Sequence, residues 1–327
     1  MNQRAEGRAR LTVLGGFLGS GKTTWLRHQL HTGRFAESCV IVNEAAETPV
    51  DDALLGQASQ LRVLAGGCAC CAGRTALVAL LRELVDIRSR TRSSSRRLQQ
   101  IVLETSGLAD PAAIVEVIRS DPVLVRHIVV NEIIVIVDAL HALGQLQREP
   151  LGRKQIEIAD QLIVTKVDTA EPASLRVLLA TLASMNPGAT LAAAVRGSAE
   201  PLADFQGTAP LPLCDLGTAP SRGPITPIRL CIDETADWPG FTVWLSALLH
   251  ARGDDIVRVK GVVRTPAGRL LLQSVHRIVQ SPEILPEGNG GPDLNAVVVL
   301  GRGYTPDQLR RSLRYFTGDS PAPRAGG

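Results

Sequence analysis

A glycine-rich segment near the start of the chain has the residue types and spacing that bind nucleotide phosphates. Residues 16–23 read Gly-Phe-Leu-Gly-Ser-Gly-Lys-Thr, which fits the P-loop pattern G-x-x-x-x-G-K-S/T. Backbone N–H groups of such a loop face phosphate oxygens, the lysine reaches the β- and γ-phosphates, and the last hydroxyl ligates Mg²⁺. Lys22 is therefore a predicted catalytic residue and Thr23 a predicted magnesium ligand. The residues predicted to bind nucleotide here are Gly16, Gly19, Ser20, Gly21, Lys22, Thr23 and Thr24.

An acidic residue follows a second apolar run, in the sequence Glu104-Thr105-Ser106-Gly107. A carboxylate at the carboxyl end of a neighbouring strand lies where Mg²⁺ and its water shell would be. We therefore predict Glu104 as a catalytic residue, and we expect Gly107 to place a backbone N–H near the γ-phosphate. The alternative is a strand-ending acid followed by an ordinary turn.

The segment Thr165-Lys166-Val167-Asp168 follows the apolar run Gln161–Val164 and suggests guanine recognition. A carboxylate at position 168 can accept hydrogen bonds from the guanine N1–H and 2-amino groups, which adenine lacks. The aliphatic stem of Lys166 can cover the base. GTPases usually have Asn where this chain has Thr165. We predict that Thr165, Lys166 and Asp168 bind the nucleotide, and the alternative is that Asp168 only caps a helix.

Three of the six cysteines lie together at Cys68, Cys70 and Cys71. Thiolates suit Zn²⁺ and compete for Co²⁺, and a nearby helix N-terminus favours the thiolate form. Three local ligands leave the coordination incomplete, which suits capture and release of a metal better than a permanent structural site. The alternative is that they are small buried residues in a glycine-rich turn. The isolated cysteines, expected to be small buried residues, are Cys39, Cys214 and Cys231.

A further acidic segment, Asn43-Glu44-Ala45-Ala46-Glu47, follows the second expected strand. Many P-loop GTPases have a switch loop there, so Glu44 or Glu47 could position water or contact Mg²⁺, and we take Glu44 as the predicted catalytic residue. A surface acidic loop explains the same residues equally well.

Composition limits the function classes. A chain of 327 residues and 34.8 kDa is long enough for two domains. A net charge of +3 is too small to predict nucleic acid or an anionic membrane as the main partner. The N-terminus has no signal-peptide pattern and the apolar run Ile128–Val137 is too short to span a bilayer, so we expect a cytoplasmic protein. The basic run Arg88–Arg97 is expected to be a solvated loop, with a docking patch for an acidic partner as the alternative.

The first part of the chain, residues 1–205, alternates apolar runs with helical patterns. Near-continuous Val, Ile and Leu runs between helices predict an α/β domain with a mainly parallel sheet. The expected strands are Leu11–Leu14, Cys39–Asn43, Leu61–Ala65, Gln100–Glu104, Ile128–Val137, Gln161–Thr165 and Thr190–Ala193. The expected helices begin near Lys22, Arg74, Pro111, Gly152 and Pro172.

A linker is expected over residues 206–223, and a smaller α+β domain over residues 224–317, followed by a disordered tail over 318–327. The expected strands of the second domain are Pro227–Asp233, Ile256–Val263, Leu270–Val275 and Ala296–Leu300, and its first expected helix is Phe241–His250. The last helix should begin after Thr305, which is a predicted N-cap residue, and continue through Leu313.

Taken together, these motifs resemble the CobW-like family of P-loop GTPases, which are metallochaperones. The resemblance covers nearly the whole chain, because it continues into the second domain. The motifs that carry it are Gly16–Thr24, Asn43-Glu44, Gly67–Cys71, Glu104–Pro111, Lys166–Asp168, Trp244-Leu245, Arg258–Gly261 and Gln273–His276.

The resemblance implies slow GTP hydrolysis coupled to delivery of Zn²⁺ or Co²⁺ to a client metalloprotein or a metal-cofactor biosynthesis enzyme. It implies that Cys68, Cys70 and Cys71 bind the metal and that Glu44 and Glu104 lie near Mg²⁺ and the hydrolytic water. The sequence leaves the metal, the client and the oligomeric state open, with a homodimer as one arrangement. The competing functions are a small-molecule kinase, which would need an acceptor pocket with a base, and a non-enzymatic zinc-binding adaptor.

Overall fold

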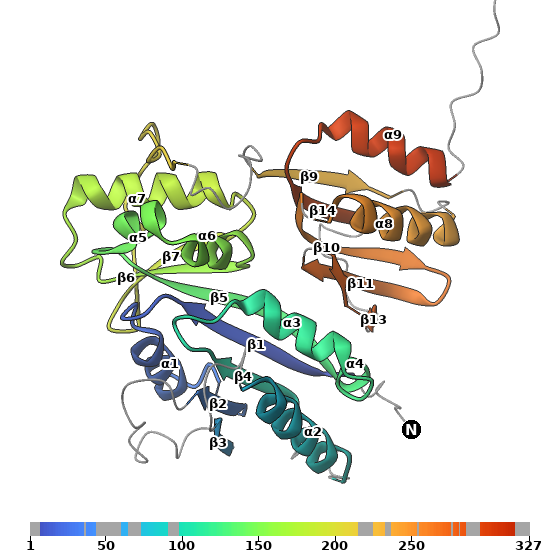
Figure 1. Ribbon diagram of the computed structural model, residues 1–327, viewed down its shortest axis with the longest axis horizontal. Helices are drawn as coiled ribbons and strands as arrows, with labels where there is room; N and C mark the ends of the chain where they lie inside the picture. Colours follow the sequence, from blue (N-terminus) through green and yellow to red (C-terminus); the bar gives the residue numbers. More distant parts are fainter. Residues whose placement is uncertain are drawn as a thin grey trace, which may run out of the picture. The chain divides into compact units, whose positions relative to one another are not determined.

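The computed structural model describes residues 7–35, 37–43, 60–64, 73–90, 98–214, 225–232, 237–253, 255–275, 277–280, 282–285 and 295–317. The chain divides into two compact units, Met1–Ser221 and Arg222–Gly327 (Figure 1). In the part of the chain that is described, no helix combines the length and the apolar composition needed to cross a membrane.

The first unit is built on one sheet in the order β3-β2-β4-β1-β5-β6-β7-β8. Every described pairing is parallel except that of β8 with β7, so the predicted mainly parallel α/β sheet is confirmed. The strands are β1 (Ala9–Gly16), β2 (Cys39–Asn43), β3 (Gln60–Leu64), β4 (Gln100–Glu104), β5 (Ile128–Asp138), β6 (Gln161–Thr165), β7 (Thr190–Val195) and β8 (Ser198–Glu200).

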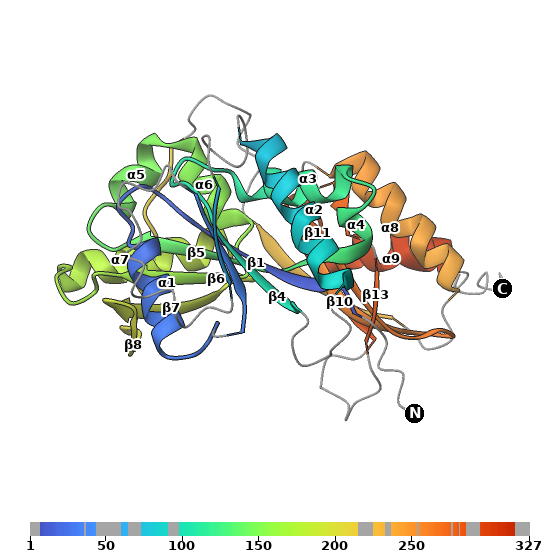
Figure 2. The same ribbon diagram turned by 90° about the horizontal axis from the view of Figure 1, so that it is seen from below.

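Helices cover both faces of this sheet, which explains why its strands are apolar without alternation. In β1 the consecutive residues Val13 and Leu14 are both fully buried. Helix α1 lies on one face (Figure 2), and its residues Trp25, Leu26 and Leu30 belong to one core cluster with strand residues. The helices are α1 (Lys22–His31), α2 (Arg74–Arg90), α3 (Pro111–Ser120), α4 (Leu124–His127), α5 (Ala142–Arg148), α6 (Pro150–Glu157) and α7 (Pro172–Met185).

The basic run does not begin in a loop as expected. Helix α2 continues to Arg90, and Arg88 is only 6% exposed. The Arg88 Nε donates to the Leu98 carbonyl at 2.9 Å, and its Nη2 donates to the Gly7 carbonyl. Arg88 lies on the buried face of α2, which it shares with Leu77, Leu81, Leu84 and Val85. The helical period of the chain therefore explains why this arginine is buried. The rest of the run, residues 91–97, lies outside the described residues.

The second unit is an α+β structure, as predicted, with an antiparallel sheet in the order β12-β11-β10-β14-β9 and β13 paired to β11. Phe241, Trp244 and Leu245 from its first helix and Leu309 from its second pack on this sheet. The strands are β9 (Thr226–Cys231), β10 (Ile256–Thr265), β11 (Gly268–Val275), β12 (Ile278–Val279), β13 (Glu283–Leu285) and β14 (Ala296–Gly301), and the helices are α8 (Trp238–Arg252) and α9 (Pro306–Thr317).

The predicted start of the last helix is confirmed, and two of the isolated cysteines are not where we expected them. The Thr305 Oγ1 accepts from the Gln308 N at 3.2 Å, while the Gln308 Oε1 accepts from the Thr305 N at 2.9 Å, which is a capping box. Cys39 is buried, but Cys214 and Cys231 are exposed. Strand alternation explains Cys231, because its neighbours Leu230 and Ile232 point into the core.

Candidate nucleotide-binding site

The glycine-rich loop joins β1 to α1 at the carboxyl edge of the parallel sheet. Gly16, Gly19 and Gly21 all have positive φ, at 132°, 72° and 89°. A Cβ on Gly16 would also lie 2.3 Å from the Ile136 carbonyl oxygen of β5, so a side chain is excluded there. Gly21 is the N-cap of α1 and supplies no side-chain cap, which leaves the first N–H groups of α1 available to an anion.

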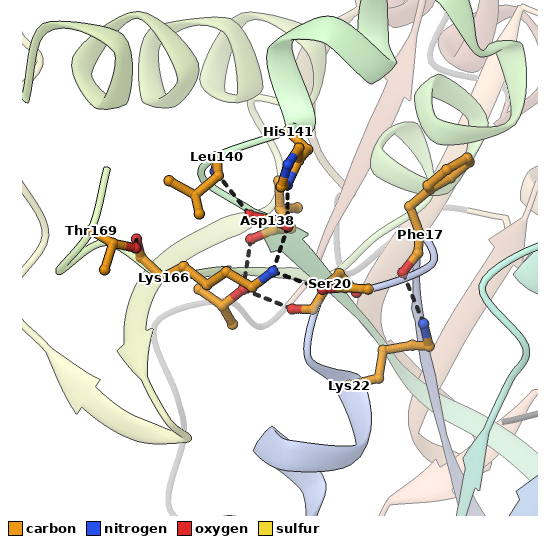
Figure 3. A network of polar contacts seen from close by, with 11 residues as sticks. Phe17, Ser20, Lys22, Asp138, Leu140, His141, Lys166 and Thr169 are labelled. Atoms are coloured by element: carbon orange, nitrogen blue, oxygen red, sulfur yellow. Dashed lines mark hydrogen bonds and ion pairs between the residues drawn. The ribbon is translucent and has the colours of Figure 1, made fainter. Parts of the chain in front are cut away.

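Lys22 lies under this loop with its ammonium group held by the loop itself. Its Nζ donates to the carbonyls of Gly16 and Phe17, each at 2.9 Å (Figure 3). Burial lowers the pKa of Lys22, and the nearby Glu104 carboxylate opposes that shift. The side chain is 9% exposed, so its charge lies inside the loop, where the phosphates of a bound nucleotide would lie.

Thr23 and Glu104 come together because β1 and β4 are neighbours, with Leu14 opposite Glu104 in the register. The Thr23 Oγ1 donates to the Glu104 Oε1 at 2.5 Å. The other carboxylate oxygen, Oε2, is buried and has no hydrogen-bond partner among the described residues. Burial raises the pKa of Glu104, and the Thr23 hydrogen bond and the Lys22 charge oppose that shift. A hydroxyl and a buried carboxylate with an unused oxygen fit the hard oxygen ligands that Mg²⁺ takes.

The other predicted residues of the loop differ in exposure. Ser20 is fully buried, and its Oγ has no hydrogen-bond partner among the described residues. Thr24 lies exposed in the first turn of α1. Its backbone carbonyl lies near Gly197, where a Cβ would be 3.3 Å from the Thr24 oxygen. Ser20 is therefore buried inside the loop, whereas the Thr24 side chain is exposed on the first turn of α1.

The segment after β4 lies directly against the P-loop. The Thr105 N and Oγ1 both donate to the Leu14 carbonyl, at 2.9 and 3.0 Å. Two residues later, a Cβ on Gly107 would lie 2.5 Å from the Leu18 N of the P-loop, too close for any side chain. The backbone of Gly107 is therefore beside the phosphate-binding loop, as its predicted role requires.

Thr165 ties the end of β6 to the P-loop. Its Oγ1 lies 2.7 Å from the Ser20 carbonyl and 3.2 Å from the Val137 carbonyl, and the residue is 6% exposed. The hydroxyl thus joins β6, β5 and the phosphate-binding loop where GTPases usually have an Asn. The replacement keeps a hydrogen bond between this strand and the loop.

The next residue, Lys166, has a left-handed backbone conformation, with a φ of 59°. Its Nζ donates to the Gly19 carbonyl at 2.9 Å and to the Asp138 Oδ2 at 2.7 Å (Figure 3). Both contacts hold the aliphatic stem across the edge of the loop. This is the placement that a stem covering a base would need.

Asp138, at the end of β5, is a site residue that the sequence prediction missed. It is 4% exposed and accepts hydrogen bonds from Lys166, from the His141 Nδ1 at 2.9 Å and from the Leu140 N at 2.8 Å (Figure 3). Burial raises the pKa of Asp138, but these hydrogen bonds outweigh burial and hold the pKa below its usual range. The available signal was its position, because it ends an apolar run at the same edge as Glu104 and Thr165.

Asp168 is exposed, and it is not a helix cap. The N-cap of α7 is Glu171, whose carboxylate oxygens accept from the Ala173 N at 2.8 Å and the Ser174 N at 2.6 Å. Within the described part of the chain the Asp168 side chain makes no hydrogen bond or ion pair. Its carboxylate therefore remains available to a ligand at the edge of the loop.

Five of the predicted residues lie outside the described part of the chain: Glu44, Glu47, Cys68, Cys70 and Cys71. The strands that precede them, β2 and β3, end at the same edge of the sheet as β4, with Val42 opposite Glu104 and Asn43 opposite Leu64. Among the described residues, no group of three or more His, Cys, Asp or Glu side chains could hold a metal ion.

Comparison with known proteins extends over both units. Residues 10–193 match the model of the CobW/HypB/UreG nucleotide-binding domain, and residues 225–317 match that of the cobalamin synthesis protein cobW C-terminal domain. The chain is 30% identical to the zinc chaperone YjiA of Escherichia coli over 315 residues, which is 93% of this chain and 97% of that relative. It is 32% identical to the zinc chaperone CobW of Pseudomonas aeruginosa over 211 residues, about half of each chain.

Solved structures agree with this assignment. A crystal structure of the Zn(II)-bound YjiA GTPase from E. coli superposes with a TM-score of 0.60 at 25% identity, covering 97% of this chain and 99% of that one. The match therefore includes the parallel sheet with its phosphate-binding loop and the antiparallel sheet that follows. The chain belongs to the CobW/HypB/UreG nucleotide-binding-domain family and carries the C-terminal domain of its CobW members.

Proposed function

We propose that this protein hydrolyses GTP to GDP and phosphate and couples the hydrolysis to binding and delivery of a transition metal, Zn²⁺ or Co²⁺. The observation that carries the proposal is the Thr23–Glu104 pair beside Lys22, in which one buried carboxylate oxygen has no partner in the part of the chain that the structure describes. The relatives named zinc chaperones support a metal as the cargo.

In the phosphate site, Lys22 supplies positive charge to the β- and γ-phosphates, and Gly107 supplies a backbone N–H near the γ-phosphate. Thr23 and Glu104 would hold Mg²⁺, whose chemistry when bound is to neutralise charge that develops on the phosphates. Glu104 also accepts the Thr23 hydroxyl, so the pair is oriented before nucleotide arrives. Glu44 is proposed to position the attacking water.

Guanine is the base that this site would select. The Asp168 carboxylate is exposed, makes no hydrogen bond or ion pair with the residues that the structure describes, and can accept from the guanine N1–H and 2-amino groups. Lys166 would cover the base with its stem, because its ammonium is anchored on Gly19 and Asp138. Thr165 fixes this strand end to the P-loop, so base and phosphates would be held at a constant separation.

The cargo metal is proposed to bind Cys68, Cys70 and Cys71, because thiolates suit Zn²⁺ and Co²⁺. The sequence that carries them lies between β3 and α2, and β3 ends at the edge of the sheet that bears the nucleotide site. Loss of the γ-phosphate contacts would then change the thiolate site and release metal to a client metalloprotein or cofactor-synthesis enzyme. The second unit is proposed to select that client.

Calorimetry with GTP, GDP and ATP, followed by assays of phosphate release with and without Zn²⁺, tests the proposal. We expect GTP and GDP to bind, ATP to bind much more weakly, and free phosphate to be the product. A Lys22→Ala variant should lose hydrolysis, and a Cys68→Ser, Cys70→Ser, Cys71→Ser variant should keep GTP binding but lose Zn²⁺ binding. Absence of GTP binding, or transfer of phosphate to a metabolite, would contradict it.

A further inference from the structure

A buried glutamine on α6 contacts the loop that carries Gly107. Gln155 is 1% exposed, and its Nε2 donates to the Ala109 carbonyl at 2.7 Å. The same nitrogen lies 3.5 Å from the Gly107 carbonyl. Both carbonyls belong to the segment 105–110, which connects Glu104 at the end of β4 to the start of α3 and is called here the β4–α3 loop. No sequence motif pointed to Gln155.

The two ends of the β4–α3 loop are fixed by their own residues. Thr105 is bound to the Leu14 carbonyl, and Asp110 caps α3 by accepting from the Ala112 N at 2.9 Å. Between these ends the loop turns, with the Ala109 N donating to the Ser106 carbonyl. The Gln155 amide binds the backbone of this central part from another element, α6. Its removal would leave the Ala109 carbonyl buried without that donor.

Gln155 itself is held rigidly. Asn186 is 1% exposed, and its Nδ2 donates to the carbonyls of Ile156, Glu157 and Ala159, at 2.7, 3.1 and 2.9 Å. These bonds fix the end of α6, one residue after Gln155, to the end of α7. The glutamine therefore acts as an anchor on a rigid element, and the loop is the part that it positions.

The side chain also lines a small cavity together with a residue of the P-loop. A cavity of about 20 Å³ is lined by Gln155, Phe17 and Asp138, among other residues. That volume holds about one water molecule and no larger ligand. The cavity is therefore too small to be a substrate pocket.

We infer that Gln155 is a positioning residue that holds the Gly107 backbone where it can contact the γ-phosphate. The inference rests on the proposed GTP hydrolysis. The Gly107 backbone already lies so close to the P-loop that a Cβ on this residue would be 2.5 Å from the Leu18 N, which leaves little room for a closer approach. Only outward displacement is open to the loop, and the Gln155 hydrogen bonds oppose that displacement. GDP lacks the γ-phosphate, so loss of this anchor should affect GTP and not GDP.

The experiment compares three variants of the full-length protein with wild type. Gln155→Leu removes both N–H donors, and Gln155→Glu keeps the shape but presents carboxylate oxygens to two carbonyls. Gln145→Leu is the matched control, because Gln145 lines the same cavity without bonding to the β4–α3 loop. Calorimetry gives the affinities for GDP and for a nonhydrolysable GTP analogue, phosphate release gives kcat and KM, and thermal unfolding reports on the fold.

We expect both Gln155 variants to bind the GTP analogue roughly tenfold more weakly, the change that loss of one buried hydrogen bond produces. GDP affinity should stay within about twofold, kcat should fall, and Gln145→Leu should match wild type. Equal losses for GDP and the GTP analogue, or none for either, in a protein whose wild type hydrolyses GTP would overturn the inference alone. A wild type that binds neither nucleotide would overturn the proposed function and this inference with it.

Discussion

Replacing Gly107 by Ala is the substitution whose effect follows most directly from the geometry of the phosphate site. The added methyl carbon would lie 2.5 Å from the Leu18 N and 2.8 Å from the Leu18 Cα. Ordinary contact begins at 3.4 Å, so the P-loop and the β4–α3 loop must separate by 0.9 Å. Both obstructing atoms belong to backbone or to its Cα, so a side-chain rotation does not relieve the collision.

A displacement of about 1 Å at a reacting group can reduce a rate about 100-fold. We therefore expect Gly107→Ala to lower kcat for GTP hydrolysis by about that factor, measured as phosphate release at saturating GTP. Overpacking should also lower the free energy of unfolding by about 1–3 kcal/mol, measured in urea.

Gly207→Ala is the control for this substitution. Gly207 has a positive φ of 75°, and a Cβ there would have no atom of the described residues within 4 Å, so the change adds backbone strain of about 1 kcal/mol without a collision. Its kcat should equal that of wild type. The reasoning would be refuted if Gly107→Ala hydrolysed GTP within about twofold of wild type, because the two loops would then not lie as close as described.

Three further predictions concern other parts of the first unit. Thr165→Val should weaken the binding of GDP and of a GTP analogue by the same factor, about tenfold in calorimetry, because the buried Ser20 carbonyl loses a hydrogen-bond donor. Thr165→Ser keeps the hydroxyl and should restore both affinities. Unequal losses for the two nucleotides would contradict this interpretation. Glu104→Gln should weaken Mg²⁺ binding, so that half-saturation of GTP-analogue binding needs about tenfold more Mg²⁺. Binding of GDP without Mg²⁺ should stay unchanged. An unaltered Mg²⁺ titration would exclude Glu104 from the magnesium site. The Asp121 carboxylate accepts hydrogen bonds from Leu124, Arg82 and Val123. Burial alone would raise the pKa of Asp121, but these bonds outweigh burial and lower it. The carboxylate therefore stabilises the folded state at neutral pH, and this stabilisation is lost as the pH falls below about 4. Asp121→Asn should therefore cost about 1–3 kcal/mol in urea unfolding near neutral pH, with the difference shrinking in acid; a constant difference would contradict the ion pair.

Much of the fold was predictable because the parallel strands are buried on both faces. The strands Cys39–Asn43, Gln100–Glu104 and Gln161–Thr165 agree with prediction at both ends, since short continuous Val, Ile and Leu runs bounded by polar residues leave little choice. Helices α4 and α5 and strand β8 were not predicted. The helices have four and seven residues and the strand has three, which are too few to show a hydrophobic period.

Site residues could be predicted where their contacts are local in sequence and not where their contacts are distant. The P-loop and the segment ending at Asp168 were predictable, because their residues are adjacent in sequence and their spacing sets their geometry. Asp138 and Gln155 were not, because their contacts depend on how β5 and α6 meet segments far away in sequence. For Asp168 the sequence left two roles open, binding of the base and capping of a helix. The structure excludes capping, because the N-cap of α7 is Glu171.

We propose that binding of the nucleotide and binding of the cargo metal are coupled. The direct test is the Zn²⁺ affinity of the full-length protein, measured by competition with a chromogenic chelator in the presence of GDP or of a nonhydrolysable GTP analogue. Allosteric coupling of about 1–3 kcal/mol corresponds to a difference of about 5- to 150-fold between the two states. We predict a difference in this range that disappears when Cys68, Cys70 and Cys71 are replaced by Ser. Equal Zn²⁺ affinities in the two nucleotide states would contradict the account.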